Sequence, residues 1–175
     1  NIRKIVLSKD NKNIIVLSSD YDRKVNIYNT NDGKLVDEIK VDSYTKDIFL
    51  DDSNLYYIDS SSVKKIDLTS IEKESEDYFE KGDLFSFNSK YILEDTNNSL
   101  KIYSFRDKKE KSTIKLSGNF SYEMSNSENY IVTLKSNSSN SDELKLFDIG
   151  GKTLAFINIG EEIKKITISG NDKHI

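Results

Sequence analysis

Cysteine and tryptophan are absent from this sequence of 175 residues, and histidine occurs only once. A chain without cysteine has no disulfides, no thiolate metal ligands and no cysteine nucleophile. The single histidine, His174, cannot supply Ser-His-Asp catalysis, a cluster of histidine metal ligands or a two-histidine facial triad. The sequence therefore predicts no catalytic residue and no histidine-based or thiolate metal site.

Glycine-rich phosphate loops, long apolar runs and an excess of positive charge are also missing. The seven glycines lie mostly in turns, so we expect no nucleotide site. No apolar stretch approaches the roughly 20 residues that a membrane helix needs, so we expect no membrane insertion. The net charge of -4 and the pI of about 5.2 disfavour nucleic-acid binding. Acids interrupt the basic run at 106–111, which we interpret as a solvated turn.

Pairs of neighbouring carboxylates are the remaining candidates for chemistry. Carboxylates perform acid and base catalysis when burial or a neighbour separates their pKa values. Each pair here falls in or beside an expected turn, where aspartate accepts backbone hydrogen bonds. The spaced oxygen ligands of an EF-hand are absent, so calcium is a remote alternative. We predict no cofactor, and no metal at these pairs, which are Asp20 with Asp22, Asp51 with Asp52, and Glu161 with Glu162.

The sequence contains four copies of one internal repeat, followed by a shorter fifth copy at its C-terminal end. The apolar position at Ile27 recurs at Ile66, Ile102 and Leu146, which gives spacings of 39, 36 and 44 residues. Such a period is typical of four-stranded propeller blades. A second landmark repeats in the same order, at Asn13, Asn54, Lys90, Asn129 and Lys173. The next positions along, Ile14, Leu55, Tyr91 and Tyr130, match His174, which we therefore place in a strand.

Each copy contains up to four short apolar segments separated by polar turns, which predicts four strands. In the first copy we expect strands near 2–8, 13–19, 23–29 and 34–40. Residues 14–17 are apolar at consecutive positions, so both faces of that strand should be buried, whereas the charged segment 35–39 suits an exposed outer strand. The whole chain is interpreted as a single partial propeller domain, with blades at about 1–40, 41–80, 81–116 and 117–158, and the start of another at 159–175.

Two segments depart from this regular pattern. Thr69 and Glu72 form a possible helix capping box, and Gly82 could end a helix, so residues 69–82 are compatible with a short helix. The alternative is a charged outer strand, which is favoured because the repeat requires one there. The serine- and asparagine-rich residues 136–141 predict a mobile loop between two strands.

The copies resemble WD-repeat and related β-propeller blades over essentially the whole chain. The pairs Tyr28-Asn29, Tyr103-Ser104 and Phe147-Asp148 stand where that family has its Trp-Asp pair. Asp22 and Asn97 match the family's turn aspartate, and Gly33-Lys34 and Gly151-Lys152 match its following turn. The sequence departs from the family in having no tryptophan and no Gly-His pair, and in the shifted register of Ile66-Asp67.

The resemblance implies an all-β fold of four-stranded antiparallel blades closed as a ring of four to eight. Four blades and the start of a fifth would leave one side open, with Ile166 and Ile168 facing solvent. We therefore expect either a longer natural protein, of which this chain is a fragment, or self-association through the open blade edges.

The repeats and the missing catalytic residue types favour a non-catalytic scaffold that recognises a protein or peptide partner. One alternative is a ligand-sensing extracytoplasmic domain of a larger protein. Another is part of a propeller enzyme whose site lies on blades not present here, such as a lactonase-like or cofactor-binding propeller. The sequence alone does not identify the partner.

Overall fold

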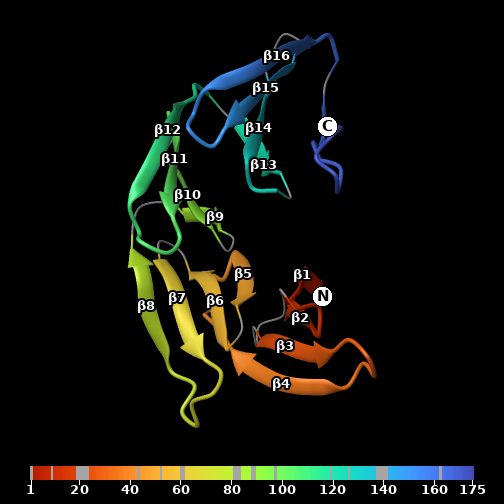
Figure 1. Cartoon of the computed structure of the whole chain (residues 1–175), viewed down its shortest axis with the longest axis vertical. Helices are drawn as coiled ribbons and strands as arrows, with labels where there is room; N and C mark the ends of the chain where they lie inside the picture. The colour runs from red at the N-terminus through yellow and green to blue at the C-terminus, as the bar shows by residue number, and fades with distance from the viewer. Residues whose placement is uncertain are drawn as a thin grey trace. The chain divides into compact units, whose positions relative to one another are not determined.

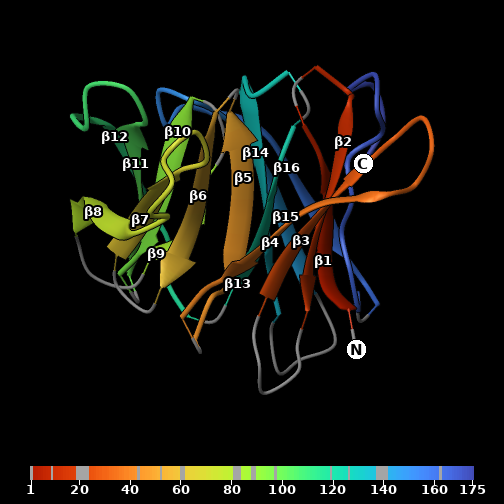
Figure 2. The same cartoon turned by 90° about the horizontal axis from the view of Figure 1, so that it is seen from below.

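The computed structural model describes residues 2–175 apart from positions 9, 19–23, 43, 52, 60, 61, 81–83, 88, 89, 97, 119, 126, 137–141 and 162, and apart from the side chains of 84–87. Within this part of the chain there are four sheets and no helix (Figure 1). Each sheet contains four consecutive antiparallel strands in chain order, as the orange-to-yellow sheet in Figure 2 shows. The predicted all-β fold is confirmed. Several positions named above lie outside the described residues: Asp20, Asp22, Asp52, Gly82, Asn97, 137–141 and Glu162.

The strand boundaries follow the repeat. Sheet 1 contains β1 (Ile2–Leu7), β2 (Asn13–Ser18), β3 (Lys24–Asn29) and β4 (Leu35–Lys40). Sheet 2 contains β5 (Asp47–Asp51), β6 (Asn54–Asp59), β7 (Ser62–Asp67) and β8 (Ser75–Glu80). Sheet 3 contains β9 (Leu84–Phe87), β10 (Tyr91–Asp95), β11 (Ser99–Ser104) and β12 (Glu110–Lys115). Sheet 4 contains β13 (Phe120–Met124), β14 (Tyr130–Lys135), β15 (Asp142–Asp148) and β16 (Thr153–Ile159).

The last strand of each sheet is largely exposed, as the charged segment 35–39 predicted for the first copy. In β4, β8 and β12 a single residue is buried, and in β16 none is. A strand at a sheet edge keeps one row of backbone groups free for water, which suits polar side chains.

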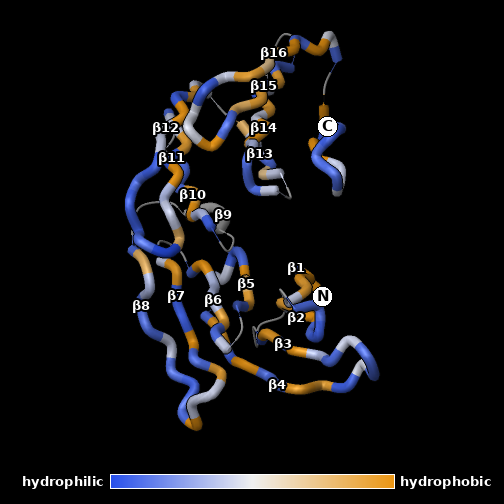
Figure 3. Tube along the Cα trace, in the orientation of Figure 1, coloured by the Kyte–Doolittle hydropathy of each residue, from blue (hydrophilic) through white to orange (hydrophobic). Residues whose placement is uncertain are grey.

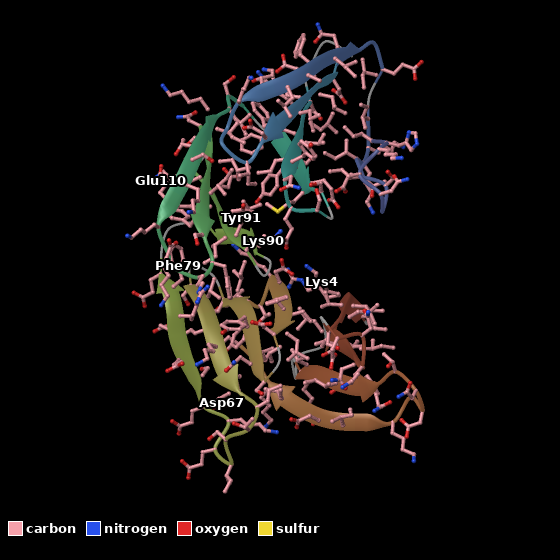
Figure 4. The ribbon with its side chains drawn as sticks, in the orientation of Figure 1. Lys4, Asp67, Phe79, Lys90, Tyr91 and Glu110 are labelled. Atoms are coloured by element: carbon pink, nitrogen blue, oxygen red, sulfur yellow. The ribbon has the colours of Figure 1, made fainter. Side chains whose placement is uncertain are left out.

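The chain divides into two compact units, Asn1–Glu94 and Asp95–Ile175. In the first unit, sheets 1 and 2 share one hydrophobic core, and their strands carry many hydrophobic residues (Figure 3). Lys4 of β1, labelled in Figure 4, adds an ion pair with the buried Asp47 of β5. The buried residues of this core are Ile15, Leu17, Val25, Ile27, Ile39, Ile48, Leu50, Leu55, Tyr57 and Ile66.

Only one face of β2 belongs to this core. Ile15 and Leu17 are 0% and 1% exposed, whereas Ile14 and Val16 are partly exposed. The prediction that both faces of this strand are buried is therefore only half right. Consecutive apolar residues indicate that both faces can be covered, and packing in the first unit covers one of them.

In the second unit, the C-terminal segment packs on sheet 4. Ile166 is 9% exposed and joins Val132, Leu134 and Leu144 in a hydrophobic cluster, with Ile168 partly buried beside them. The expectation that Ile166 and Ile168 face solvent is wrong, because the segment folds back onto the apolar face of sheet 4. Described residues between 161 and 175 form no strand, so the expected opening strand of a fifth copy is not formed.

The segment that suited either a helix or a strand ends in strand β8. Residues 69–72 form a turn, in which the Asp67 side chain accepts hydrogen bonds from the Thr69 backbone N–H and hydroxyl. β8 then pairs with β7, where Lys64 and Lys65 form ion pairs of 2.7 and 3.0 Å with Asp77 and Glu76. The favoured alternative, an outer strand, is confirmed for Ser75–Glu80.

Equivalent turns follow the third strands of sheets 1, 3 and 4, and each contains a residue in the left-handed backbone region. These residues are Gly33, Lys108 and Gly151, with φ values of 68°, 60° and 85°. In the first two turns, the N–H of Gly33 and of Lys108 bonds the carbonyl four residues earlier. Glycine adopts this conformation freely, whereas other residues are strained by about 1–2 kcal/mol.

Substitutions at these turns should change stability in opposite directions. We expect Gly151→Ala to lower the free energy of unfolding by about 1 kcal/mol and Lys108→Gly to raise it by about 0.5 kcal/mol, because only glycine is unstrained at positive φ. Urea unfolding of the whole chain measures both changes. Gly160→Ala is the control, since an added Cβ there meets no atom within 4 Å and φ is not in the left-handed region. Equal effects at Gly151 and Gly160 would contradict the role of backbone strain.

Candidate functional site

One face of sheet 4 brings together charged and aromatic side chains from three strands. Thr133 of β14 stands opposite Lys145 of β15, and Lys135 stands opposite Glu143. Phe120 of β13 stands on the other side of Lys135. Cross-strand partners project on the same side of a sheet, so the register alone places these five side chains together.

These five side chains line a pocket of about 230 Å³. The remaining lining comes from the end of β12 and the residues that follow it, so the pocket lies between sheet 4 and the connection that leads into it. Those residues are Lys115, Leu116 and Ser117.

Hydrogen bonds and ion pairs hold two of the lysines in place. The Lys145 ammonium lies 2.5 Å from the Glu143 carboxylate and 5.4 Å from the centroid of the Phe156 ring. The Lys135 ammonium donates to the Ser117 hydroxyl at 3.2 Å. Such contacts reduce the conformational entropy that a ligand would otherwise have to remove on binding.

The pocket carries positive charge on a protein that is negative as a whole. Three lysines and one glutamate give the lining a net charge of +2, against -4 for the entire chain. Leu116 and Phe120 add apolar surface beside the ammonium groups. A lining of this kind fits a carboxylate-bearing group with an adjacent apolar portion, since lysine ammonium groups pair with carboxylates and apolar surface is buried favourably.

The residues that the sequence singled out as chemical candidates do not gather in this pocket. Asp51 ends β5, and Glu161 lies in a bend after β16. His174 is exposed and does not belong to a strand. The prediction of a strand at His174 is wrong; its backbone N–H instead bonds the Ser169 hydroxyl and closes a turn. The basic run at 106–111 covers the exposed β11–β12 turn and the start of β12, as expected. Among the described residues, no group of three His, Cys, Asp or Glu side chains could hold a metal ion.

Sequence reasoning missed the three pocket lysines. Lys115, Lys135 and Lys145 are separated by 20 and 10 residues in a chain with 26 basic residues, so nothing distinguishes them in the sequence. The available signal was positional, because Lys115 and Lys135 end their strands and the repeat places the strands of Lys135 and Lys145 in register.

No protein-family model matches this sequence, and a search of curated proteins finds no match. Solved structures do match. Hydrazine synthase of Kuenenia stuttgartiensis superposes with a TM-score of 0.70 at 14% identity, over 98% of this chain and 53% of that one. Kluyveromyces lactis Hsv2 has a TM-score of 0.62 at 12% identity, over 89% and 51%. The β-propeller domain of Myceliophteria thermophila Cps50 (Swd1) has a TM-score of 0.59 at 14% identity, over 85% and 52%.

The four sheets are β-propeller blades. At these identities the likeness concerns the fold alone, and this chain spans about half the length of the solved structures that it matches. The described residues contain no helix that is both long and apolar enough to cross a membrane.

Proposed function

We propose that this chain is a non-catalytic β-propeller scaffold of the WD-repeat type that recognises protein or peptide segments, and that the lysine pocket on sheet 4 binds an acidic segment. The observation that carries the proposal is the convergence of Lys115, Lys135 and Lys145 around 230 Å³ of space. Their spacing on separate strands suits an extended peptide with carboxylates on successive residues, and Phe120 offers an aromatic contact for it.

The pocket lining also argues against the enzymatic alternative. It contains a single carboxylate, Glu143, which is paired with Lys145, and no histidine. General acid-base catalysis needs a group that can take up or release a proton near neutral pH. The likeness to hydrazine synthase concerns the fold, so it does not support an enzyme here.

The proposal predicts that the chain binds an acidic peptide through this pocket. The probe is a fluorescently labelled peptide of alternating glutamate and leucine, measured by fluorescence anisotropy with the whole chain. We expect Lys115→Glu with Lys135→Glu to weaken binding at least tenfold, since two attractions become repulsions. Added salt should weaken binding of the unaltered chain, because exposed charges are screened.

The matched control is Lys12→Glu with Lys34→Glu, which makes the same change in net charge at two lysines in the turns of sheet 1, whose side chains are 75% and 82% exposed. This control should bind within about twofold of the unaltered chain, since these two lysines do not line the pocket and exposed charges are screened. An equal loss of affinity in both double variants would show that net charge, and not the pocket, is responsible for binding. Absence of binding in the unaltered chain would reject the acidic ligand.

A further inference from the structure

The two ends of the chain are copies of each other. Residues 2–14 and 163–175 align without a gap, and six of the 13 positions are identical. Both segments form the same turn: the N–H of Ser8 bonds the carbonyl of Asn13, the N–H of Ser169 bonds that of His174, and both distances are 2.9 Å. The identical pairs are Ile2 and Ile163, Lys4 and Lys165, Ile5 and Ile166, Ser8 and Ser169, Lys12 and Lys173, and Ile14 and Ile175.

The equivalent apolar residues differ sharply in burial. Ile166 is 9% exposed because it packs on Val132 and Leu144 of sheet 4. Its counterpart Ile5 is 57% exposed, and so is Leu7, the counterpart of Ile168. The C-terminal segment therefore indicates that residues with this sequence pattern pack on the apolar face of sheet 4.

Leu7 and Ile5 belong to a face of sheet 1 that has one apolar row across all four strands. In register, Leu7 stands opposite Ile14, which stands opposite Tyr28, and Leu35 of β4 completes the row. Ile5 stands opposite Val16 in the next row, which continues with Asn26 and Glu38. This face is opposite to the one that joins the core with sheet 2, since Ile15 and Leu17 point the other way. We call the residues Ile5, Leu7, Ile14, Val16, Tyr28 and Leu35 the open face of sheet 1.

Sheet 4 has apolar surface that its own C-terminal segment leaves uncovered. Leu154 and Ile157 of β16 are 45% and 54% exposed. A groove of about 380 Å³ runs between the sheet and the C-terminal segment, lined in part by Tyr130, Leu146 and Ile175. A four-stranded sheet would cover more of this surface than the single segment does.

We propose that the open face of sheet 1 docks on the apolar face of sheet 4 of a second copy of this chain, where it takes the place of residues 163–175. The two surfaces are different, so the contact is heterologous and joins copies head to tail, as a closed ring or a longer chain of copies. In the single copy, residues 163–175 occupy the acceptor surface and compete with the incoming copy. The proposal does not depend on the lysine pocket, which lies on the opposite face of sheet 4.

Sedimentation equilibrium of the whole chain tests this association over about a hundredfold range of concentration, enough to follow a tenfold change in Kd. We expect a mass of two or more copies at the upper end. Ile5→Asp with Leu7→Asp should weaken association at least tenfold, because both carboxylates would be buried in the contact. Ile166→Asp should strengthen it, because the competing segment is released from sheet 4. Ile71→Asp, at a fully exposed turn residue, should leave it unchanged.

Disulfide trapping identifies the two surfaces even where a substitution disturbs folding, since the natural chain contains no cysteine. Copies carrying Ile5→Cys are mixed with copies carrying Leu154→Cys and oxidised mildly. A mixed disulfide between the two kinds of copy is expected, and Ile71→Cys in place of Ile5→Cys should give none. The proposal is overturned if disulfides form only between two copies that carry Ile5→Cys. It is also overturned if the unaltered chain and the Ile166→Asp variant both remain monomeric.

Discussion

Replacing Ile15 by alanine is expected to lower the free energy of unfolding by about 2–5 kcal/mol, because it removes buried methyl groups and leaves a cavity that the core fills only in part. Ile15 is 0% exposed and packs in the core shared by sheets 1 and 2. Urea unfolding followed by circular dichroism measures the loss. A loss near the upper end would indicate that the strands of the two sheets cannot move together to close the cavity.

The control for this change is Ile71→Ala, which removes the same atoms from a turn residue that is 101% exposed. Its effect should stay within about 0.5 kcal/mol, as for other surface substitutions. Similar losses at Ile15 and Ile71 would mean that sheets 1 and 2 do not share a core in solution.

Alkaline pH is expected to destabilise the protein through Tyr57. Burial raises the pKa of the Tyr57 hydroxyl far above its usual value, and the nearby carboxylates of Asp42 and Asp59 raise that pKa further. The hydroxyl donates to Asp42 at 2.9 Å, a bond that only the protonated form can make. Above about pH 10 the unfolded chain releases this proton while the folded chain keeps it, so stability falls as pH rises.

The measurement is the melting temperature between about pH 8 and pH 11, a range that brackets the ordinary tyrosine pKa. Tyr57→Phe should reduce the alkaline decline, leaving the part that comes from Tyr56 and Tyr78, whose pKa values burial also raises. Tyr44→Phe, at a ring that is 68% exposed, is the control and should retain the full decline. An unchanged decline in Tyr57→Phe would show that its hydroxyl is not buried in solution.

The strands of the four complete copies, and their grouping into four-stranded sheets, follow from the sequence alone. Short apolar segments bounded by polar turns are a local property, and in these copies they recur with the period of four-stranded blades. Even residues 69–82, where a capping box competed, contain a strand from Ser75 onward, because β7 supplies Lys64 and Lys65 opposite Asp77 and Glu76.

Which faces are covered, and which side chains meet, became visible in the folded chain alone. Residues 2–14 and 163–175 are identical at six of 13 positions, yet Ile5 is exposed and Ile166 is buried, because burial depends on whether a sheet lies against that residue. The three pocket lysines likewise meet through strand register and the path of the β12–β13 connection. These are contacts between residues distant in sequence, and a local pattern does not specify them.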